Sequence, residues 1–403
     1  MTYMKKKLWI ICLTFILCTS SGCVYYQEIN KMAVILGIAV DQMQQLDGKK
    51  LYRVTIQVVD PNQIASSAGF TPGASGVPVL DIKGEGENII QAVRDATRKT
   101  SRQTYFGHLE VIIIGEEIAR EGLNGILDTF ERDANVRAEV PVLISRGVPA
   151  FHVLGTLSAL NIIPAQSING KLKNMERLLG TGLDVPLYKL VQRISTKGIN
   201  PCLTGVVVNG LFDKSSKLAN VESSQVIQSF ISGIGIFNRE MKLVQWVDGA
   251  DAKTITLLHN KLQNTVVSLP NSSTTFEITE SNVDKEAVLR NGKYVLKVKI
   301  KLDAELEGLQ EEIDVTKPFV VHKLEEQLNK KFRDDVVHGI QTVQRTQSDV
   351  FGFGLSIYQK RPQEWKKVEK DWDRIFQNAS IEVSVQSNIQ RLGYIQKHFP
   401  KEK

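Results

Sequence analysis

Cysteine is scarce in this sequence. Only four cysteines occur in 403 residues, and two of them, Cys12 and Cys18, lie in an N-terminal segment with the features of a secretion signal. If that segment is removed and Cys23 carries lipid, as argued below, Cys202 has no partner and an internal disulfide is excluded. A chain of this length can be stabilised by its hydrophobic core instead. We expect Cys202 to be a small buried apolar residue.

A strong excess of one charge is also absent. The formal net charge is +6, and removal of residues 1–22 takes away three lysines and no acid, which leaves +3. Proteins that bind nucleic acid usually concentrate basic residues on one face. The composition therefore gives no support for a nucleic-acid partner.

The sequence also lacks the common catalytic motifs: Gly-x-Ser-x-Gly, a Walker loop and the kinase signature are all missing. Gly84-Glu85-Gly86 precedes an expected helix, but Ile89 stands where a dinucleotide fingerprint needs its third glycine, so we interpret the segment as a loop before a helix. Neighbouring residues on a helix do not face one another, so adjacent acids are interpreted as solvated faces. These pairs are Glu116-Glu117, Glu311-Glu312, Glu325-Glu326 and Asp334-Asp335.

The six histidines show no close spacing typical of metal ligands, and no cysteine accompanies them. His108 follows Tyr105-Phe106-Gly107 and precedes an apolar run; a structural hydrogen bond is favoured there over a functional role. We therefore expect no metal, no cofactor and no catalytic residue, and predict that the protein is not an enzyme.

The N-terminus carries a clear signal. Three lysines, Lys5 to Lys7, precede an apolar run of ten residues at 8–17, which is too short to span a bilayer. This pattern is typical of a signal peptide. Small residues at 19–22 then lead to Cys23, which we predict to be the lipidated first residue of the mature chain. The alternatives are an ordinary signal peptide or an uncleaved anchor. No second apolar stretch of spanning length follows.

Three regions follow the predicted signal peptide of residues 1–22. The first, 23–200, is expected to be an α/β domain, because strands alternate with helices. Its segment 155–200 is ambiguous and could include a linker, and the Gly/Pro/Ser-rich segment 61–78 is expected to be a loop. Strands are predicted at 32–40, 51–59, 79–82, 109–114 and 140–145, and helices at 87–102, 116–121 and 123–132. The strand 51–59 is expected to place Tyr52, Val54, Ile56 and Val58 on one face. The helix 87–102 is expected to place Ile89, Ile90, Val93 and Thr97 on one side.

The second region, 201–272, is expected to be a strand-rich middle domain. A strand at 203–208, a hairpin of 231–237 with 243–247 and a helix at 252–260 are predicted there.

The third region, 273–403, is expected to be an α+β domain. Strict alternation over 294–306 predicts a strand with one wet face, and 319–346 has the apolar stripe of a long helix. A further helix is predicted to begin at Pro362 and to carry Trp365 and Trp372 on one side, before a last strand near 381–385. The fold class is thus mixed α/β and α+β, in an elongated, three-domain, lipid-anchored protein.

Phe351-Gly352-Phe353-Gly354 alternates aromatics with glycines. A sharp turn after the long helix is the favoured interpretation. The alternative is that the glycines let another backbone approach closely.

Several of these segments together resemble the Ger(x)C family, the lipoprotein C subunits of spore germinant receptors. Cys23, Glu28, Ile29 and Asn30 fit the start of the family pattern, although Val24 and Tyr25 depart from its usual Trp-Asp. Further matches, in order along the mature chain, are Gly107-His108-Leu109, Gly115-Glu116-Glu117, Gly122-Leu123, Arg132-Asp133, Gly233-Ile234-Gly235-Ile236-Phe237, Lys242-Leu243-Val244, Ser348-Asp349-Val350-Phe351-Gly352-Phe353-Gly354, Trp365 and Trp372.

The resemblance implies a three-domain α/β structure anchored by an N-terminal diacylglyceryl and acyl lipid in the inner spore membrane. It also implies two polytopic partners, the A and B subunits of a nutrient-sensing receptor that starts germination, and no catalytic site. Two other functions remain open. A substrate-binding lipoprotein of a transporter would need two similar α/β lobes, and a membrane-anchored hydrolase would need the motifs that are missing.

Overall fold

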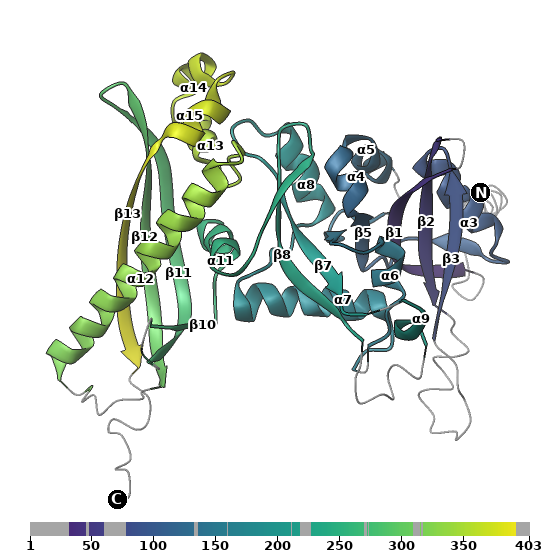
Figure 1. The fold of residues 1–403 in the computed structure, drawn as a ribbon, viewed down its shortest axis with the longest axis horizontal. Helices are drawn as coiled ribbons and strands as arrows, with labels where there is room; N and C mark the ends of the chain where they lie inside the picture. The colour runs from purple at the N-terminus through teal and green to yellow at the C-terminus, as the bar shows by residue number, and fades with distance from the viewer. Residues whose placement is uncertain are drawn as a thin grey trace, which may run out of the picture.

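The computed structural model describes residues 32–45, 48–59, 78–132, 136–158, 160–210, 212–217, 227–269, 272, 274–308, 315 and 317–391. The predicted signal peptide, Cys23 and nearly all of the segment 61–78 lie outside these residues. Figure 1 shows an elongated molecule in which two sheets stand side by side along the long axis. The mixed fold class predicted from the sequence is confirmed. None of the helices within the described ranges has the length and hydropathy needed to cross a membrane.

The first sheet has nine strands and contains both parallel and antiparallel pairs. Its order is β3-β2-β1-β5-β6-β7-β8-β9, with β4 paired to β1. Strands β1, β5, β6 and β7 run parallel to one another, whereas β2, β3, β8 and β9 are added by antiparallel pairing. The strands are β1 (Met32–Gln44), β2 (Lys50–Val59), β3 (Val79–Gly86), β4 (Gln103–Tyr105), β5 (Val111–Gly115), β6 (Val142–Ser145), β7 (Cys202–Val208), β8 (Ser229–Phe237) and β9 (Leu243–Val247).

Helices cover both faces of the central strands. Ala92 of α3 (Ile89–Arg98) belongs to the buried cluster on one face, and Leu154 of α6 (Ala150–Leu154) and Ile168 of α7 (Pro164–Asn174) belong to the cluster on the other. The apolar run of β1 is buried on both sides for this reason, as its unbroken apolar sequence predicted. The remaining helices of this part are α4 (Glu116–Glu121), α5 (Asn124–Arg132), α8 (Leu187–Ser195) and α9 (Phe212–Ser215).

The side-chain face predicted for β2 is confirmed, whereas the face predicted for α3 is wrong at one position. In β2, Val54 and Ile56 are buried as expected. Gln57 on the opposite face is buried as well. Its side-chain amide donates a hydrogen bond to Leu154 O and accepts one from Ala165 N–H. The alternation of β2 therefore reflects buried polar residues and not an exposed face. In α3, Ile90 is 53% exposed, so its predicted place on the apolar side is wrong.

Residues 155–200 are more regular than the ambiguous sequence suggested. They form α7, a single π-helical turn η2 (Met175–Leu179) and α8, and Leu172 of α7 and Leu190 of α8 are fully buried. The segment thus packs on the first sheet.

The predicted middle region continues this first sheet. The hairpin of β8 and β9 and the helix α11 (Gly249–Leu258) form where the sequence predicted them. Strand β7 pairs with β6, so hydrogen bonds cross the boundary expected at residue 200. The division into three domains therefore stays a prediction: it concerns which parts of the chain can fold on their own.

The second sheet has four strands in the order β10-β11-β12-β13, and α12 (Pro318–Gln344) runs along one of its faces (Figure 1). The predicted alternation of β12 is confirmed, with Leu296 to Leu306 buried at every second position, and so is the apolar stripe of α12. The strands are β10 (Thr265–Ser268), β11 (Thr275–Arg290), β12 (Lys293–Gly308) and β13 (Ser380–Arg391).

The edge strand β13 is partly covered by α12. Backbone N–H groups of Ser387 and Ile389 donate to the side chains of Asn329 and Glu325, at 2.7 and 3.2 Å. Two donors on the open edge of the sheet are therefore already occupied.

The last helical region differs from the single helix predicted from Pro362. Three helices form, α13 (Phe353–Lys360), α14 (Pro362–Val368) and α15 (Trp372–Asn378), and the chain turns between α14 and α15. Trp365 and Trp372 are nonetheless both buried, because the turn keeps their rings together at a centroid distance of 5.8 Å.

Candidate functional site at the junction of the two sheets

The segment Ser348–Gly354, which carries the resemblance near the C-terminus, lies where the second sheet meets the first. It links the end of α12 to the start of α13. Gln347 and Gly352 adopt left-handed backbone conformations, with φ of 58° and 80°. The predicted sharp turn is thus confirmed, and Gly352 occupies a conformation that favours glycine.

Asp349 organises this turn. Its carboxylate is fully buried and accepts the backbone N–H groups of Gly352 at 2.8 Å, Phe353 at 3.2 Å and Gly354 at 2.7 Å. The indole Nε1 of Trp372 donates a fourth hydrogen bond at 3.0 Å. A buried carboxylate is costly unless its oxygens are satisfied, and here four donors satisfy them.

Burial raises the pKa of the Asp349 carboxyl to about 6, against the opposing effect of the Gly354, Trp372, Phe353 and Gly352 donors. A raised pKa means that folding favours the protonated acid. This contribution to stability is present at low pH and is lost as pH rises from the ordinary value near 3.8 to about 6.

Aromatic rings fill the space around this carboxylate. Tyr294 packs edge-on against Trp372 at 5.7 Å, and Phe353 lies 6.0 Å from Phe351 and 6.4 Å from Phe376. Such contacts add to the area that the rings remove from water.

A second backbone approaches the glycines of this segment, so the alternative interpretation of Phe351–Gly354 is also confirmed. Gly198 precedes β7 and has φ of 76°; a Cβ atom there would lie only 2.3 Å from the carbonyl carbon of Gly354. Leu355 N donates to Gly198 O at 2.7 Å, and Asn200 N donates to Asp349 O at 2.8 Å. Backbone hydrogen bonds therefore join the segment Ser348–Gly354 and the residue after it directly to the residues that precede β7 of the first sheet.

Ion pairs surround this backbone contact. Lys197 pairs with Glu369 at 2.8 Å, and Arg239 pairs with Asp373 at 2.9 Å. The Arg239 guanidinium also donates to Glu369 O at 3.1 Å. Each pair is partly exposed and contributes little to stability alone. Together they link the end of α14 and the start of α15 to the residues before β7 and after β8 of the first sheet.

A buried histidine completes the junction. His259 at the end of α11 donates from Nε2 to Val350 O at 3.0 Å, and its Nδ1 faces Arg193 at 3.4 Å. The carbonyl can only accept, so Nε2 carries the proton and Nδ1 accepts from Arg193. Burial, and next the charges of Arg193 and Lys285, hold the pKa of His259 well below its usual value. The ring is therefore a neutral structural connector.

Cys202 contacts the same arginine as this histidine. It is fully buried as predicted, with the Arg193 guanidinium 3.4 Å from its sulfur. Burial raises the pKa of the Cys202 thiol, which disfavours the reactive thiolate.

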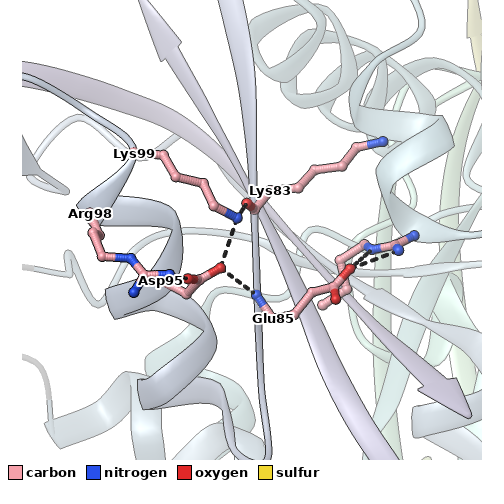
Figure 2. Close-up of polar contacts among 6 residues, drawn as sticks. Lys83, Glu85, Asp95, Arg98 and Lys99 are labelled. Carbon is pink, nitrogen blue, oxygen red and sulfur yellow. Dashed lines mark hydrogen bonds and ion pairs between the residues drawn. The ribbon is translucent and has the colours of Figure 1, made fainter. Parts of the chain in front are cut away.

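The remaining candidates from the sequence are placed apart from the junction. Gly84 and Gly86 belong to β3 and not to a loop, and a Cβ on Gly84 would lie 2.1 Å from Ala92 O. These glycines let α3 pack closely on the strand. Figure 2 shows the resulting contact: Asp95 of α3 accepts Glu85 N–H at 3.1 Å and the Lys99 ammonium at 2.8 Å.

His108 is exposed and packs edge-on against Tyr105 at 5.6 Å. Its expected structural hydrogen bond does not form with any described residue. Among these residues there is also no group of three or more acids, histidines or cysteines that could hold a metal ion.

Two of the acidic pairs are not simply solvated faces. Glu116 accepts Trp246 Nε1 at 3.0 Å and Gly147 N at 2.9 Å, and Glu325 accepts Ile389 N. The prediction is wrong for these two residues, which connect separate elements.

Comparison with known proteins matches nearly the whole chain. The description "Spore germination protein N-terminal domain" fits residues 25–208, and "Spore germination B3/GerAC like, C-terminal" fits residues 232–393. Spore germination protein KC of Bacillus subtilis (strain 168) is 24% identical over 92% of both chains, and spore germination protein B3 of the same organism is 24% identical over 95% of this chain and 97% of that protein. The crystal structure of the GerBC protein shares the fold, with a TM-score of 0.56, 21% identity, and coverage of 87% of this chain and 97% of that chain.

These matches define a class, the spore germination proteins that combine this N-terminal domain with this C-terminal domain. The chain belongs to the Ger(x)C family, the C subunits of spore germinant receptors, as its motifs predicted. The relatives give no support to the alternative of a substrate-binding lipoprotein of a transporter.

Proposed function

We propose that this chain is a non-catalytic, lipid-tethered subunit that starts spore germination by contact with polytopic A and B receptor subunits. The tether would be a diacylglyceryl and acyl lipid on Cys23. It would hold the mature chain on the outer face of the cytoplasmic membrane, which becomes the inner membrane of the spore.

One observation carries this proposal. The most distinctive family segment, Ser348–Gly354, is used to build a buried junction around Asp349 and Trp372, with no reactive group left free. Its glycines and aromatics determine shape. A protein whose signature residues fix the relative position of two large parts is suited to present a surface to partners.

The lipid tether supports the same mechanism. Two acyl chains bind a membrane far more persistently than one, because each buried CH₂ contributes about 0.8 kcal/mol. Confinement at the membrane raises the effective concentration of the subunit near its partners. A modest direct affinity is then sufficient for assembly.

The tether is tested with Cys23→Ala and labelled palmitate. The wild type should incorporate label and Cys23→Ala should not, while Cys202→Ala serves as the matched control that keeps the label. Labelled Cys23→Ala would place the lipid elsewhere.

The mechanism is tested in spores that carry an exported but unlipidated form of the chain. Germination through the cognate receptor should fall sharply, while the melting temperature of the purified protein stays unchanged. Full germination by the unlipidated form at normal abundance would contradict the tethered-contact mechanism and would favour a diffusible activity.

A further inference from the structure

A cleft of about 320 Å³ lies between α11, α12 and the edge strand β10 (Figure 1). The two helices touch where Thr254 of α11 meets Gly339 of α12: a Cβ atom on Gly339 would lie 2.6 Å from Thr254 Oγ1. The cleft lies before this contact along α12, at residues 331–336, and shares no lining residue with the Asp349 turn. Its volume is at the lower end of the range of small-molecule sites.

The floor of this cleft is apolar. Each side chain there is more than nine-tenths buried and belongs to the large buried cluster that spans both sheets; these residues are Leu257, Leu262, Val267, Phe332 and Val336. An apolar group that covered the floor would leave water, at a gain of about fourfold in affinity for each buried CH₂. The floor therefore favours a hydrocarbon ligand.

The charge that lines the cleft is unbalanced. Its charged residues are Lys253, Lys331 and Asp335. Lys331 pairs with Asp335 at 2.9 Å. Lys253 has no carboxylate partner within the described residues; its ammonium group donates only to Val266 O, at 3.4 Å. Burial, and next the charge of Lys331, lower the pKa of Lys253. An anion near both lysines would balance this excess of positive charge.

We propose that this cleft binds a single-chain amphiphile, which combines one anionic head group with an unbranched alkyl tail. The head, a carboxylate or a phosphate, lies between the ammonium groups of Lys253 and Lys331. The tail lies on the floor of the cleft against Phe332 and Val336. The lysine stems add apolar surface beside the tail, while their charged ends reach the head. This proposal rests on the cleft alone and does not depend on the tethered-contact mechanism.

The test uses residues 24–403, which keep every described residue and need no detergent because they lack the predicted lipid site. Octanoate and octyl phosphate carry both head and tail. Butyrate carries the head with a short tail, octanol carries the tail without charge, and octylamine carries the opposite charge. Binding is measured by isothermal titration calorimetry. At least one of the two anionic amphiphiles should bind, at least tenfold more tightly than butyrate, octanol or octylamine.

Matched variants locate the bound probe. Lys253→Gln and Lys331→Gln should each weaken binding of the anionic amphiphile about tenfold, because each removes a charged hydrogen bond. Lys330→Gln changes the exposed neighbour of Lys331 outside the cleft and should leave the affinity unchanged. Ala250→Trp, at an exposed position that lines the cleft in the first turn of α11, should block entry and abolish binding without lowering the melting temperature.

Three results would overturn the proposal. The first is failure of both octanoate and octyl phosphate to bind at concentrations up to about 10 mM. The second is equally tight binding of octanol or octylamine, which would show that the anionic head is not recognised. The third is unchanged affinity in both lysine variants or in a folded Ala250→Trp variant, which would place the bound amphiphile elsewhere on the chain.

Discussion

The nine-stranded sheet carries helices on both faces, whereas the four-stranded sheet carries a helix on one face only. Central residues of β1 are buried without a break, while β12 alternates between buried and exposed positions. The outer face of β12 bears Lys297, Lys299 and Lys301; Lys299 and Lys301 are exposed, and Lys297 is half-buried and lies 4.0 Å from Glu382. The central strands of the first sheet are therefore expected to tolerate little change on either face, whereas the second sheet has one exposed face that can vary.

The junction decides whether these two sheets behave as one unit. Apolar side chains on both sides of it belong to a single buried cluster that reaches from β1 to β13. Asp349, Gly198 and His259 add directional hydrogen bonds to this apolar contact. We expect coupled unfolding of the two sheets as long as the junction is intact.

Trp372→Ala should have the largest effect on this coupling. Truncation of a buried Trp costs about 3–5 kcal/mol, and here it also removes a donor from Asp349. The second sheet should unfold at lower denaturant, so that a single transition separates into two, as measured by urea unfolding with fluorescence and circular dichroism. Phe319→Ala, at a 78% exposed aromatic on α12, is the control and should change little.

Trp372→Phe refines the same test, because it keeps a ring and removes only the hydrogen bond to the carboxylate. A loss of about 1.5–3 kcal/mol is expected for a bond to a charged group. An unchanged transition in both Trp372 variants would show that the ring does not couple the sheets.

His259→Gln should change how stability depends on pH. The pKa of His259 is lowered by burial, so the unfolded chain binds a proton below pH about 6.5 and the folded chain does not. The free energy of unfolding should fall on this account by up to about 1.4 kcal/mol for each pH unit below 6.5.

The free energy of unfolding is measured in urea at pH 7, 6 and 5. His259→Gln should show a shallower decline than the wild type, and His322→Gln, at an exposed histidine, should follow the wild type. Asp349 opposes the histidine over part of this range, since its raised pKa favours the folded state at low pH. Parallel profiles for wild type and His259→Gln would contradict a neutral buried His259.

The smallest effect is expected on the open face of the second sheet. Lys299→Ala should change the free energy of unfolding by no more than about 0.5 kcal/mol, as surface substitutions usually do. Ile300→Ala, one residue along and buried under α12, should cost about 2–5 kcal/mol. Equal effects of the two substitutions would mean that both faces of this sheet are covered.

Much of the fold could be predicted because the patterns were local. The alternation of β12 and the stripe of α12 each follow from spacing within one segment. Strand β11 was missed because its pairing shifts between Thr275/Phe276 and Ile278/Glu280, which interrupts its alternation. Asn291-Gly292, with φ of 49° and 76°, is a hairpin signal that would have indicated it.

The site could be predicted only in part. The motif containing Asp349 was recognised, but its role depends on Trp372 and on Gly198, which lie far from it in sequence. Gly198, Arg193 and His259 carried no local signal. Cys23 stays a prediction that rests on the sequence around it.

The covering of β13 by α12 has a consequence for crowding. If the proposed lipid tether holds the chain at a membrane, copies of it share one plane, where an open strand edge can pair with a neighbouring copy and extend the sheet. At Ser387 and Ile389 the donors that such a neighbour would need are bonded to Asn329 and Glu325. Two side chains of a helix thereby oppose aggregation through this edge, in addition to the charged Glu382 on the strand itself.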